Sequence, residues 1–263
     1  MSSTAAPNEH TDLFHLGGCN ALVTGSTRGL GREIGLGLAR HGARWIVNGT
    51  SEERVREMVT TLQREGIHCA GYAFDITQPE SVRLSIARIE EEIGPIDVLV
   101  NNAGISRRAL LVDISEEDWQ AVIDLNLSST WRVGREVARR MITRKRGKII
   151  NIASLQSFGG RESTGAYAAS KGGLVALTWT MAVEWAEHGI QANAITPGYF
   201  ITDLTRHLAE NPQFDAWVKL RTPAKRWGEP RELVGAAVFL ASEASSFVNG
   251  QVLYVDGGWT AKL

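Results

Sequence analysis

The chain has 263 residues, of which 43% are hydrophobic and 22% are charged, and its formal net charge is -1. This length and composition favour one large globular domain over two. The near-neutral charge gives no overall field that would attract nucleic acid or an anionic membrane, so small-molecule partners are expected.

Residues 1–12 have neither the basic start nor the apolar stretch of a signal peptide, and no apolar run is long enough to span a bilayer. We expect residues 1–15 to form a loose polar tail and residues 16–263 to form a single domain. The cysteines, Cys19 and Cys69, have no second Cys or His at ligand spacing, so no metal site is expected. Buried free thiols fit a reducing, cytoplasmic environment.

Short β-branched runs alternate with longer amphipathic segments along the chain, which is typical of βαβ units. The expected strands span residues 20–24, 44–48, 68–73, 98–100, 148–152, 191–195 and 253–255. Expected helices span residues 29–41, 51–65, 78–93, most of 115–144, and 166–187. This order predicts an α/β fold with a single Rossmann-like doubly wound parallel sheet and helices on both faces. The region 196–230, rich in Pro, Trp and charge, is expected to form a small helical lid over the ligand crevice.

A glycine-rich segment follows the first expected strand and opens the first helix. Glycines at such a turn let backbone amides approach a pyrophosphate, whose charge is favoured by the helix N-terminus. Taken alone the segment is equally well read as a simple turn, but its strand–helix context favours dinucleotide binding. The cofactor-binding candidates in it are Gly25, Ser26, Thr27, Arg28, Gly29, Leu30 and Gly31.

The end of the second strand indicates which dinucleotide is preferred. An Asp or Glu there would bind the ribose diol and repel a 2′-phosphate. This chain instead has the neutral residues Asn48, Thr50 and Ser51, and Arg28 in the glycine loop could reach the phosphate. We therefore predict NADP(H) over NAD(H). The alternative is a solvated Arg28, with the hydroxyls accommodating either cofactor.

Two further segments lie at the carboxyl ends of strands, where a cofactor binds in this type of fold. Asp75, next to Ile76, could accept the adenine amino group. Asn102 precedes the small pair Ala103 and Gly104, which lets the chain pass close to adenosine. A plain tight turn is the structural alternative for the second segment.

Tyr167 and Lys171 are four residues apart, so in a helix they share one face. A lysine cation near a tyrosine favours the phenolate and lowers its pKa, which would make the phenol an acid/base near neutral pH. For an isolated pair, a solvated helix face is the commoner explanation. The interpretation therefore depends on the surrounding residues.

From Gly17 onward the chain resembles the short-chain dehydrogenase/reductase family. The motifs that carry the resemblance stand in the family's order: the glycine loop, Asn101–Gly104, Asn126, Ser154, Tyr167 with Lys171, Pro197–Gly198 and Val255–Gly258. The resemblance implies a homotetramer, and it extends the cofactor site to Pro197, Gly198, Phe200 and Thr202.

The resemblance also implies a catalytic tetrad. Tyr167 would act as general acid/base, and Ser154 would bind the substrate oxygen. Lys171 would tune Tyr167 and hold the nicotinamide ribose, while Asn126 would help to anchor a water of a proton relay. Taken singly, Ser154 could be a cap and Asn126 a buried structural amide.

Substrate candidates come from the more variable loops. Guanidinium groups of Arg107 and Arg161 suit a carboxylate, and Gln156 suits hydroxyls, so together with Ser154 and Tyr167 they fit a sugar acid. Solvent exposure at the rim is the alternative for either arginine. The segments 104–108, 155–157, 198–200 and 221–228 are similar to those of gluconate 5-dehydrogenases. This implies reversible interconversion of D-gluconate and 5-keto-D-gluconate with a nicotinamide cofactor.

Two other functions stay open. A 3-oxoacyl-carrier-protein reductase would use the same tetrad and need a basic surface, for which residues 139–146 supply a cluster: Arg139, Arg140, Arg144, Lys145 and Arg146. We interpret this cluster as the basic end of a long helix. A non-catalytic NADP-binding regulatory protein would keep the fold, but the presence of Ser154, Tyr167 and Lys171 argues against it.

Overall fold

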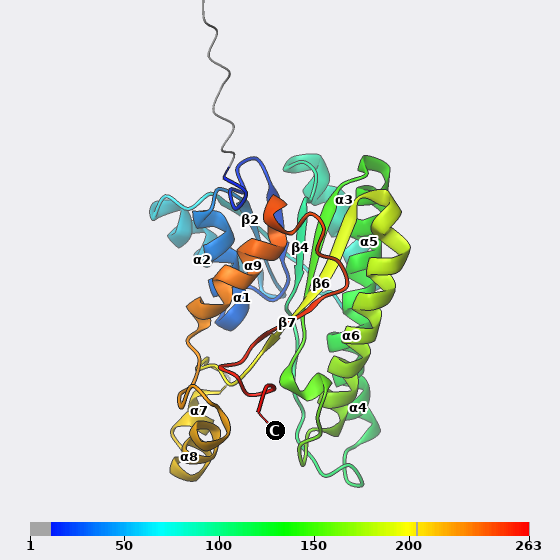
Figure 1. Cartoon of the computed structure of the whole chain (residues 1–263). Helices are drawn as coiled ribbons and strands as arrows, with labels where there is room; N and C mark the ends of the chain where they lie inside the picture. Colours follow the sequence, from blue (N-terminus) through cyan, green and yellow to red (C-terminus); the bar gives the residue numbers. More distant parts are fainter. Residues whose placement is uncertain (1–11, 204, 263) are drawn as a thin grey trace, which may run out of the picture.

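One parallel sheet organises the fold. The computed structural model describes residues 12–203 and 205–262, and within them seven strands pair in the order β3-β2-β1-β4-β5-β6-β7 (Figure 1). Every neighbouring pair is parallel. The strands are β1 (Asn20–Val23), β2 (Arg44–Gly49), β3 (Cys69–Ala73), β4 (Val98–Asn101), β5 (Gly147–Ile152), β6 (Ile190–Pro197) and β7 (Val252–Val255).

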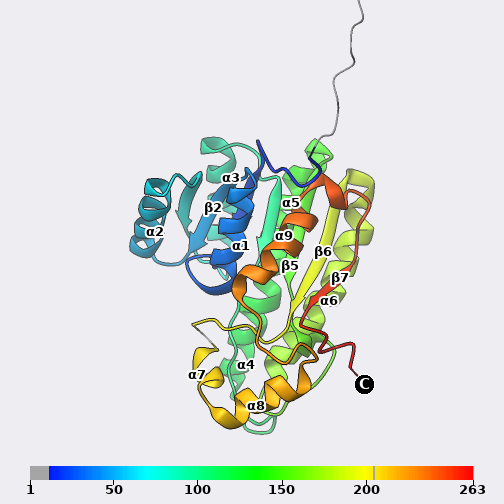
Figure 2. The same ribbon diagram turned by 60° about the vertical axis from the view of Figure 1, so that its left-hand side comes forward.

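Helices cover both faces of the sheet, each over its own apolar core. One core packs α1, α2 and α9 against one face, and the other packs α3, α5 and α6 against the opposite face (Figures 1 and 2). The described α-helices are α1 (Gly29–Arg40), α2 (Glu52–Arg64), α3 (Pro79–Glu92), α4 (Glu116–Ile123), α5 (Ser129–Arg144), α6 (Gly165–Trp185), α7 (Arg206–Ala209), α8 (Pro212–Arg221) and α9 (Val234–Ala241). The predicted doubly wound α/β fold is confirmed.

The predicted elements differ from the structure in two places. The long helix expected over 115–144 is interrupted by a π-helical turn, Asp124–Ser128, between α4 and α5. The helix α9 and the short 3₁₀ turn before it, Pro230–Leu233, were not predicted. Most of α9 is apolar, so it lacks the periodic polar face by which a surface helix is recognised.

The predicted lid is present as two short helices beyond the carboxyl ends of the strands (Figure 2). Asn211 caps α8 by accepting hydrogen bonds from the backbone N–H groups of Gln213 and Phe214, both at 3.0 Å. Pro212 at the first turn also favours the helix start. We call the segment between β6 and α7 and the segment after α8 the two arms of the lid. A parallel bridge between Phe200 and Gly228 joins them. Leu204 lies outside the described residues.

The N-terminal region is described only from Asp12. Residues 1–11 of the predicted tail lie outside the described residues, and the carbonyl of Leu13 accepts a hydrogen bond of 3.2 Å from the backbone N–H of Ala244. Cys19 is partly buried and Cys69 is buried; both are free, and burial raises the pKa of each thiol. None of the described helices has the length and apolar character needed to cross a membrane.

Candidate active site

The glycine loop between β1 and α1 is shaped by the neighbouring β4 loop. Gly25 and Gly29 have φ angles of +60° and +58°, which side-chain-bearing residues rarely adopt. A Cβ on Gly25 would lie 2.9 Å from the Cα of Ala103, and one on Gly31 would overlap the amide of Asn102. Glycines are therefore required here both by backbone conformation and by the close approach of the two loops.

The first turn of α1 lacks a side-chain cap. Arg28 stands at the N-cap position without a capping hydrogen bond, so the N–H groups that open the helix are available to an anion. The Arg28 side chain is exposed, as is Thr50 at the end of β2. Ser51 caps α2 by accepting a hydrogen bond of 3.3 Å from the N–H of Arg54. This part of the structure suits a phosphorylated ligand.

Asn48 and Asn102 hold the loops together through their side chains. The Oδ1 of Asn48 accepts a hydrogen bond from the N–H of Gly25 at 3.1 Å, and its Nδ2 donates to the carbonyls of Tyr72 and Phe74 at 3.3 and 3.2 Å. The Nδ2 of Asn102 donates to the carbonyl of Thr24 at 2.9 Å and to that of Gly25 at 3.2 Å. The side-chain amides of Asn48 and Asn102 therefore hold the backbone of the glycine loop in place. Their role is to shape the cofactor site rather than to contact a ligand directly.

Asp75 lies at the end of β3, where an adenine contact was expected. Its Oδ1 accepts hydrogen bonds from the N–H and the hydroxyl of Thr77, both at 2.8 Å. Its second carboxylate oxygen has no hydrogen bond to a described residue. Ile76 beside it is buried, with 5% of its surface exposed. The turn therefore fixes the carboxylate while leaving one acceptor for a ligand.

Ser154, Tyr167 and Lys171 come together at the carboxyl ends of β5 and β6. The Lys171 ammonium lies 5.8 Å from the centroid of the Tyr167 ring and donates a hydrogen bond of 2.6 Å to the carbonyl of Ile152. The Ser154 hydroxyl lies near enough to the Tyr167 phenol to lower its pKa, and it accepts a hydrogen bond of 3.2 Å from the N–H of Gln156. Ser157 donates a hydrogen bond of 2.9 Å to the carbonyl of Lys171, which ties the loop after β5 to α6.

Burial dominates the protonation of this pair. Desolvation raises the pKa of the Tyr167 phenol, and the hydrogen bond with Ser154 lowers it in part. Desolvation also lowers the pKa of the Lys171 ammonium to about 8. The prediction that Lys171 lowers the pKa of Tyr167 below its ordinary value is therefore wrong in direction for this structure, in which burial raises that pKa.

Asn126 lies within the π-helical turn and is fully buried. Its Nδ2 donates hydrogen bonds to the Ser170 hydroxyl at 3.0 Å and to the Ile105 carbonyl at 2.9 Å. Its backbone carbonyl accepts one from the Thr130 hydroxyl at 3.1 Å. π-Helical turns are rare and frequently lie at functional sites. This one brings the β4 loop and α6 together beside Lys171.

The predicted substrate residues are only partly brought together. Arg161 is partly buried under the lid and donates a hydrogen bond of 3.2 Å to the Tyr199 hydroxyl. Gln156 has a buried side-chain oxygen that finds no partner in the described part of the chain. Arg107 is exposed and lies 3.6 Å from Asp118 on α4, at the rim. Arg161 and Gln156 therefore suit a bound polar ligand better than Arg107 does.

The residues after β6 connect the sheet to the lid. Pro197 ends β6, and a Cβ on Gly198 would lie 2.7 Å from the Cα of Asp256, so a side chain is excluded there. Phe200 is buried, and the Thr202 hydroxyl lies 3.0 Å from that of Thr205. Tyr199 was not predicted as a site residue, although it touches Arg161. Its signals in the sequence were its place in the segment 198–200, which carries part of the resemblance, and the Trp-rich composition of the lid.

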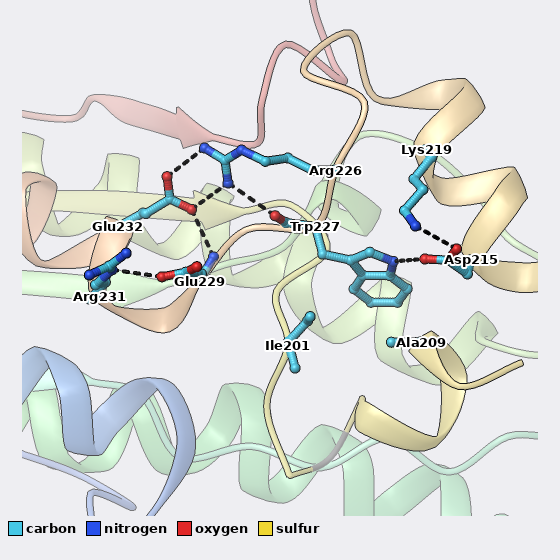
Figure 3. Close-up of a pocket in the computed structure, with 9 residues that line it drawn as sticks. All are labelled: Ile201, Ala209, Asp215, Lys219, Arg226, Trp227, Glu229, Arg231 and Glu232. Carbon is cyan, nitrogen blue, oxygen red and sulfur yellow. Dashed lines mark hydrogen bonds and ion pairs between the residues drawn. The ribbon is translucent and has the colours of Figure 1, made fainter.

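A hollow of about 490 Å³ lies between the two arms of the lid (Figure 3). Its charged side chains are paired with one another: Arg226 binds Glu232 at 2.6 Å, and Lys219 binds Asp215 at 2.7 Å. Asp215 also accepts a hydrogen bond of 2.9 Å from the Trp227 indole. None of the catalytic candidates lines this hollow, so we assign it to the framework of the lid.

Comparison with known proteins identifies the family. A family model described as enoyl-(acyl carrier protein) reductase matches residues 25–260. The gluconate 5-dehydrogenase of Gluconobacter oxydans is 48% identical over 254 residues, covering 97% of this chain and 99% of that protein. The chain belongs to the short-chain dehydrogenase/reductase family. It is an oxidoreductase that uses a nicotinamide cofactor to act on a secondary CH–OH group.

Other members of the family share the fold and differ in named substrate. The 2-dehydro-3-deoxy-D-gluconate 5-dehydrogenase of Formosa agariphila is 46% identical over 254 residues, 96% of each chain. A gluconate 5-dehydrogenase from Burkholderia cenocepacia, crystallised with NADP and tartrate, is 47% identical and superposes with a TM-score of 0.94. That alignment covers 96% of this chain and 99% of the other. The named substrates of both dehydrogenases are sugar acids.

Proposed function

We propose that the protein interconverts D-gluconate and 5-keto-D-gluconate with NADP(H). The observation that carries this proposal is the partly buried Arg161 guanidinium, which donates a hydrogen bond to the Tyr199 hydroxyl and forms no ion pair with a described carboxylate. The carboxylate of a substrate would supply the partner for an ion pair with Arg161. The relatives named for gluconate support the same substrate class.

In this proposal the tetrad moves one proton. Tyr167 accepts the hydroxyl proton during oxidation and returns it during reduction, and Ser154 donates a hydrogen bond to the substrate oxygen. Lys171 holds the nicotinamide ribose and places a positive charge near the phenol. Asn126 holds the surrounding loops and supports the proton relay. When bound, the nicotinamide supplies the hydride acceptor or donor.

We propose NADP(H) as the preferred cofactor. The glycine loop, with Ser26, Thr27, Leu30 and the open first turn of α1, would hold the pyrophosphate. Arg28, Thr50 and Ser51 offer a cation and hydroxyl groups for the 2′-phosphate, with no acidic residue at the end of β2 to repel it. Asp75 and Ile76 would bind adenine, with Ala103 and Gly104 alongside adenosine. Pro197, Gly198, Phe200 and Thr202 would border the nicotinamide.

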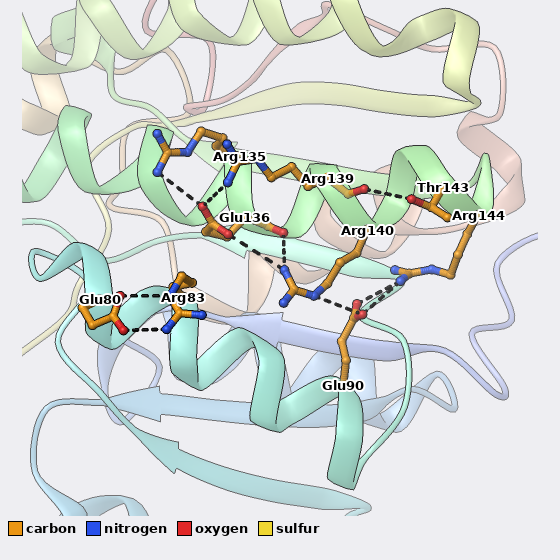
Figure 4. Close-up of polar contacts among 9 residues, drawn as sticks. All are labelled: Glu80, Arg83, Glu90, Arg135, Glu136, Arg139, Arg140, Thr143 and Arg144. Atoms are coloured by element: carbon orange, nitrogen blue, oxygen red, sulfur yellow. Dashed lines mark hydrogen bonds and ion pairs between the residues drawn. The ribbon is translucent and has the colours of Figure 1, made fainter.

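The basic cluster at residues 139–146 gives limited support to an acyl-carrier substrate, because carboxylates on α3 and α5 neutralise part of it (Figure 4). Arg139 pairs with the buried Glu136 at 3.0 Å, and Arg144 pairs with Glu90 on α3 at 3.0 Å. Arg140 lies between the same two carboxylates. Arg140 and Arg144 therefore join α5 to α3, whereas Arg139 pairs within α5. These pairings reduce the positive charge available to an acidic carrier protein.

A second candidate substrate is 2-dehydro-3-deoxy-D-gluconate, favoured by the similarity to the Formosa agariphila enzyme. It too is a sugar acid that Arg161 could bind. Initial rates with D-gluconate and with this acid, each with NADP⁺ and NAD⁺, separate the candidates. A higher kcat/KM for D-gluconate with NADP⁺ supports our proposal. Reduction of 3-oxoacyl thioesters alone would overturn it, and no turnover with any substrate would favour the regulatory protein.

For the assembly we propose a cytoplasmic homotetramer in which residues 16–263 form the catalytic domain and residues 1–15 a tail. Exposed apolar side chains support this assembly, since they would otherwise face water: Trp179 and Val183 on α6, with Phe247 and Tyr254 near β7. Light scattering of the purified protein tests the oligomeric state.

A further inference from the structure

The Arg161 guanidinium lies among aromatic rings that the lid supplies. It is 4.5 Å from the centroid of the Phe214 ring and 5.5 Å from that of Trp217, and both residues belong to α8. Its Nη1 donates a hydrogen bond of 3.2 Å to the Tyr199 hydroxyl. We call Tyr199, Phe214 and Trp217 the aromatic cage. The cage holds the guanidinium without neutralising it.

The cage is itself fixed by further packing within the lid. The Tyr199 ring contacts those of Phe214 and Trp217, each at 5.8 Å, in edge-on geometry. Trp227 and Trp259 pack against the same ring at 5.6 and 5.0 Å. Because Tyr199 lies at the centre of this cluster, the position of its hydroxyl is fixed. The hydrogen bond from Arg161 to this hydroxyl in turn fixes the guanidinium.

The guanidinium connects the lid to the catalytic side of the crevice. Arg161 belongs to the loop between β5 and α6, a few residues before Tyr167, whereas the cage comes from the segment after β6. Tyr199 is close enough to Tyr167 for its ionisation to affect the pKa of that phenol. An anion bound to Arg161 would therefore lie between the lid and the reacting end of the crevice.

The contacts of Arg161 with the cage include no anionic partner, because Phe214 and Trp217 contribute rings and Tyr199 contributes a hydroxyl. An aromatic ring over the face of a planar guanidinium leaves its N–H groups pointing outward in the plane, which is the geometry that a carboxylate binds in bidentate fashion. Within the described residues no carboxylate takes this position. A partly buried cation of this kind is stabilised when a ligand brings the negative charge.

We propose that the aromatic cage is a specificity-determining element, which holds Arg161 to bind the substrate carboxylate and thereby makes the lid select sugar acids over neutral polyols. This inference rests on the proposed function, because it assumes a sugar-acid substrate. Tyr199, Phe214 and Trp217 act through Arg161 and are positioning residues; of these four residues, only Arg161 contacts the substrate.

The test compares D-gluconate with D-sorbitol, a neutral polyol of equal carbon number. Arg161→Lys keeps the charge but loses the planar edge, and Trp217→Leu removes one wall of the cage. We expect both to lower the ratio of kcat/KM for D-gluconate to that for D-sorbitol, by about tenfold or more for Arg161→Lys, as for loss of a charge-assisted hydrogen bond. Trp131→Leu is the matched control, since Trp131 stacks on Arg135 at 4.5 Å away from the crevice. An unchanged ratio in Arg161→Lys would overturn the inference.

A binding measurement separates this inference from the proposed function. In Tyr167→Phe, whose turnover is expected to be slower by about 10²-fold or more, tryptophan fluorescence of the enzyme with NADP⁺ is titrated with D-gluconate and with D-sorbitol. We expect D-gluconate to bind more tightly, and we expect Arg161→Lys to remove that preference in the same background. Equal affinity for both ligands would contradict the inference that Arg161 binds the substrate carboxylate, even if wild type oxidises D-gluconate. A preference for gluconate without turnover by wild type would instead contradict the proposed function alone.

Discussion

The side-chain amide of Asn126 pairs with both backbone polar groups of Ile105. Its Oδ1 accepts a hydrogen bond of 2.8 Å from the Ile105 N–H, and its Nδ2 donates one of 2.9 Å to the Ile105 carbonyl. Ile105 follows Gly104, where a Cβ would lie 3.1 Å from the same Asn126 side chain. The π-helical turn thus holds the β4 loop in place beside Lys171.

We expect Asn126→Ala to destabilise the fold by about 2–4 kcal/mol, because it leaves both backbone groups of Ile105 without partners in a buried site. Asn126→Asp keeps the acceptor for the Ile105 N–H but places a carboxylate oxygen against the Ile105 carbonyl in a buried position, so its effect should be at least as large. Urea unfolding monitored by circular dichroism measures both. Equal stability of wild type and Asn126→Ala would show that the pairing with Ile105 contributes little.

The raised pKa of Tyr167 predicts opposite pH dependences for the two directions. Oxidation needs the phenolate, so its kcat/KM should rise as the pH increases above neutral. Reduction needs the protonated phenol, so its kcat/KM should fall only at alkaline pH. Tyr167→Phe should lose about 10²-fold or more in both directions. A pH profile for oxidation that is flat between pH 6 and 10 would contradict the role of Tyr167 as the base.

Lys171 should reduce the stability of the fold at neutral pH. The pKa of Lys171 is about 8 in the folded protein, against an ordinary value of 10.5. Below pH 8 the folded state therefore carries the cost of a buried ammonium. Between these values the unfolded chain binds more protons, and stability rises with pH by about 3 kcal/mol.

The variant Lys171→Met has no titratable group at this position, so its stability lacks the pH dependence that the Lys171 ammonium causes. The variant loses the donor to the Ile152 carbonyl, but that cost does not depend on pH. We therefore expect the stability of the variant relative to wild type to be greatest below pH 8 and to decline towards pH 10.5. Chemical unfolding across this range measures the difference. A difference that does not change with pH would argue against a depressed pKa.

Arg28→Ala should reduce the preference for NADPH. Loss of one charge-assisted contact predicts a decrease of about tenfold or more in kcat/KM for NADPH, with little change for NADH. Arg32→Ala is a suitable control, because Arg32 lies in the first turns of α1 and pairs with Glu33 at 2.7 Å. A wild-type enzyme that prefers NADH would contradict the prediction before any variant is made.

Local patterns were sufficient to predict the sheet, since each strand lies between recognisable turns and amphipathic helices. They were insufficient for α9, whose apolar sequence has no polar face; its place becomes clear only from contacts such as that of Val234 with Gly37 on α1. The glycine loop was predictable for the same local reasons. Its steric cause, the approach of Ala103 to Gly25, depends on a pairing of distant segments.

Within the site, residue types were easier to predict than their partners. Asn48 was expected near a cofactor, but its amide is committed to backbone groups from β3 and the glycine loop. Arg161 was expected to bind a substrate, whereas the aromatic cage that holds it comes from the segment after β6, which is distant in the sequence. No local pattern relates Arg161 to Phe214, so this relationship becomes visible only in the folded chain.

The product formed from D-gluconate tests the central claim most directly. Purified wild type and Tyr167→Phe are incubated with D-gluconate and NADP⁺, and the product is identified by ¹³C NMR while NADPH formation is followed at the same time. We predict 5-keto-D-gluconate and equimolar NADPH from wild type, and negligible amounts of either from the variant. Oxidation at another carbon, no oxidation by wild type, or unchanged oxidation by Tyr167→Phe would contradict the account.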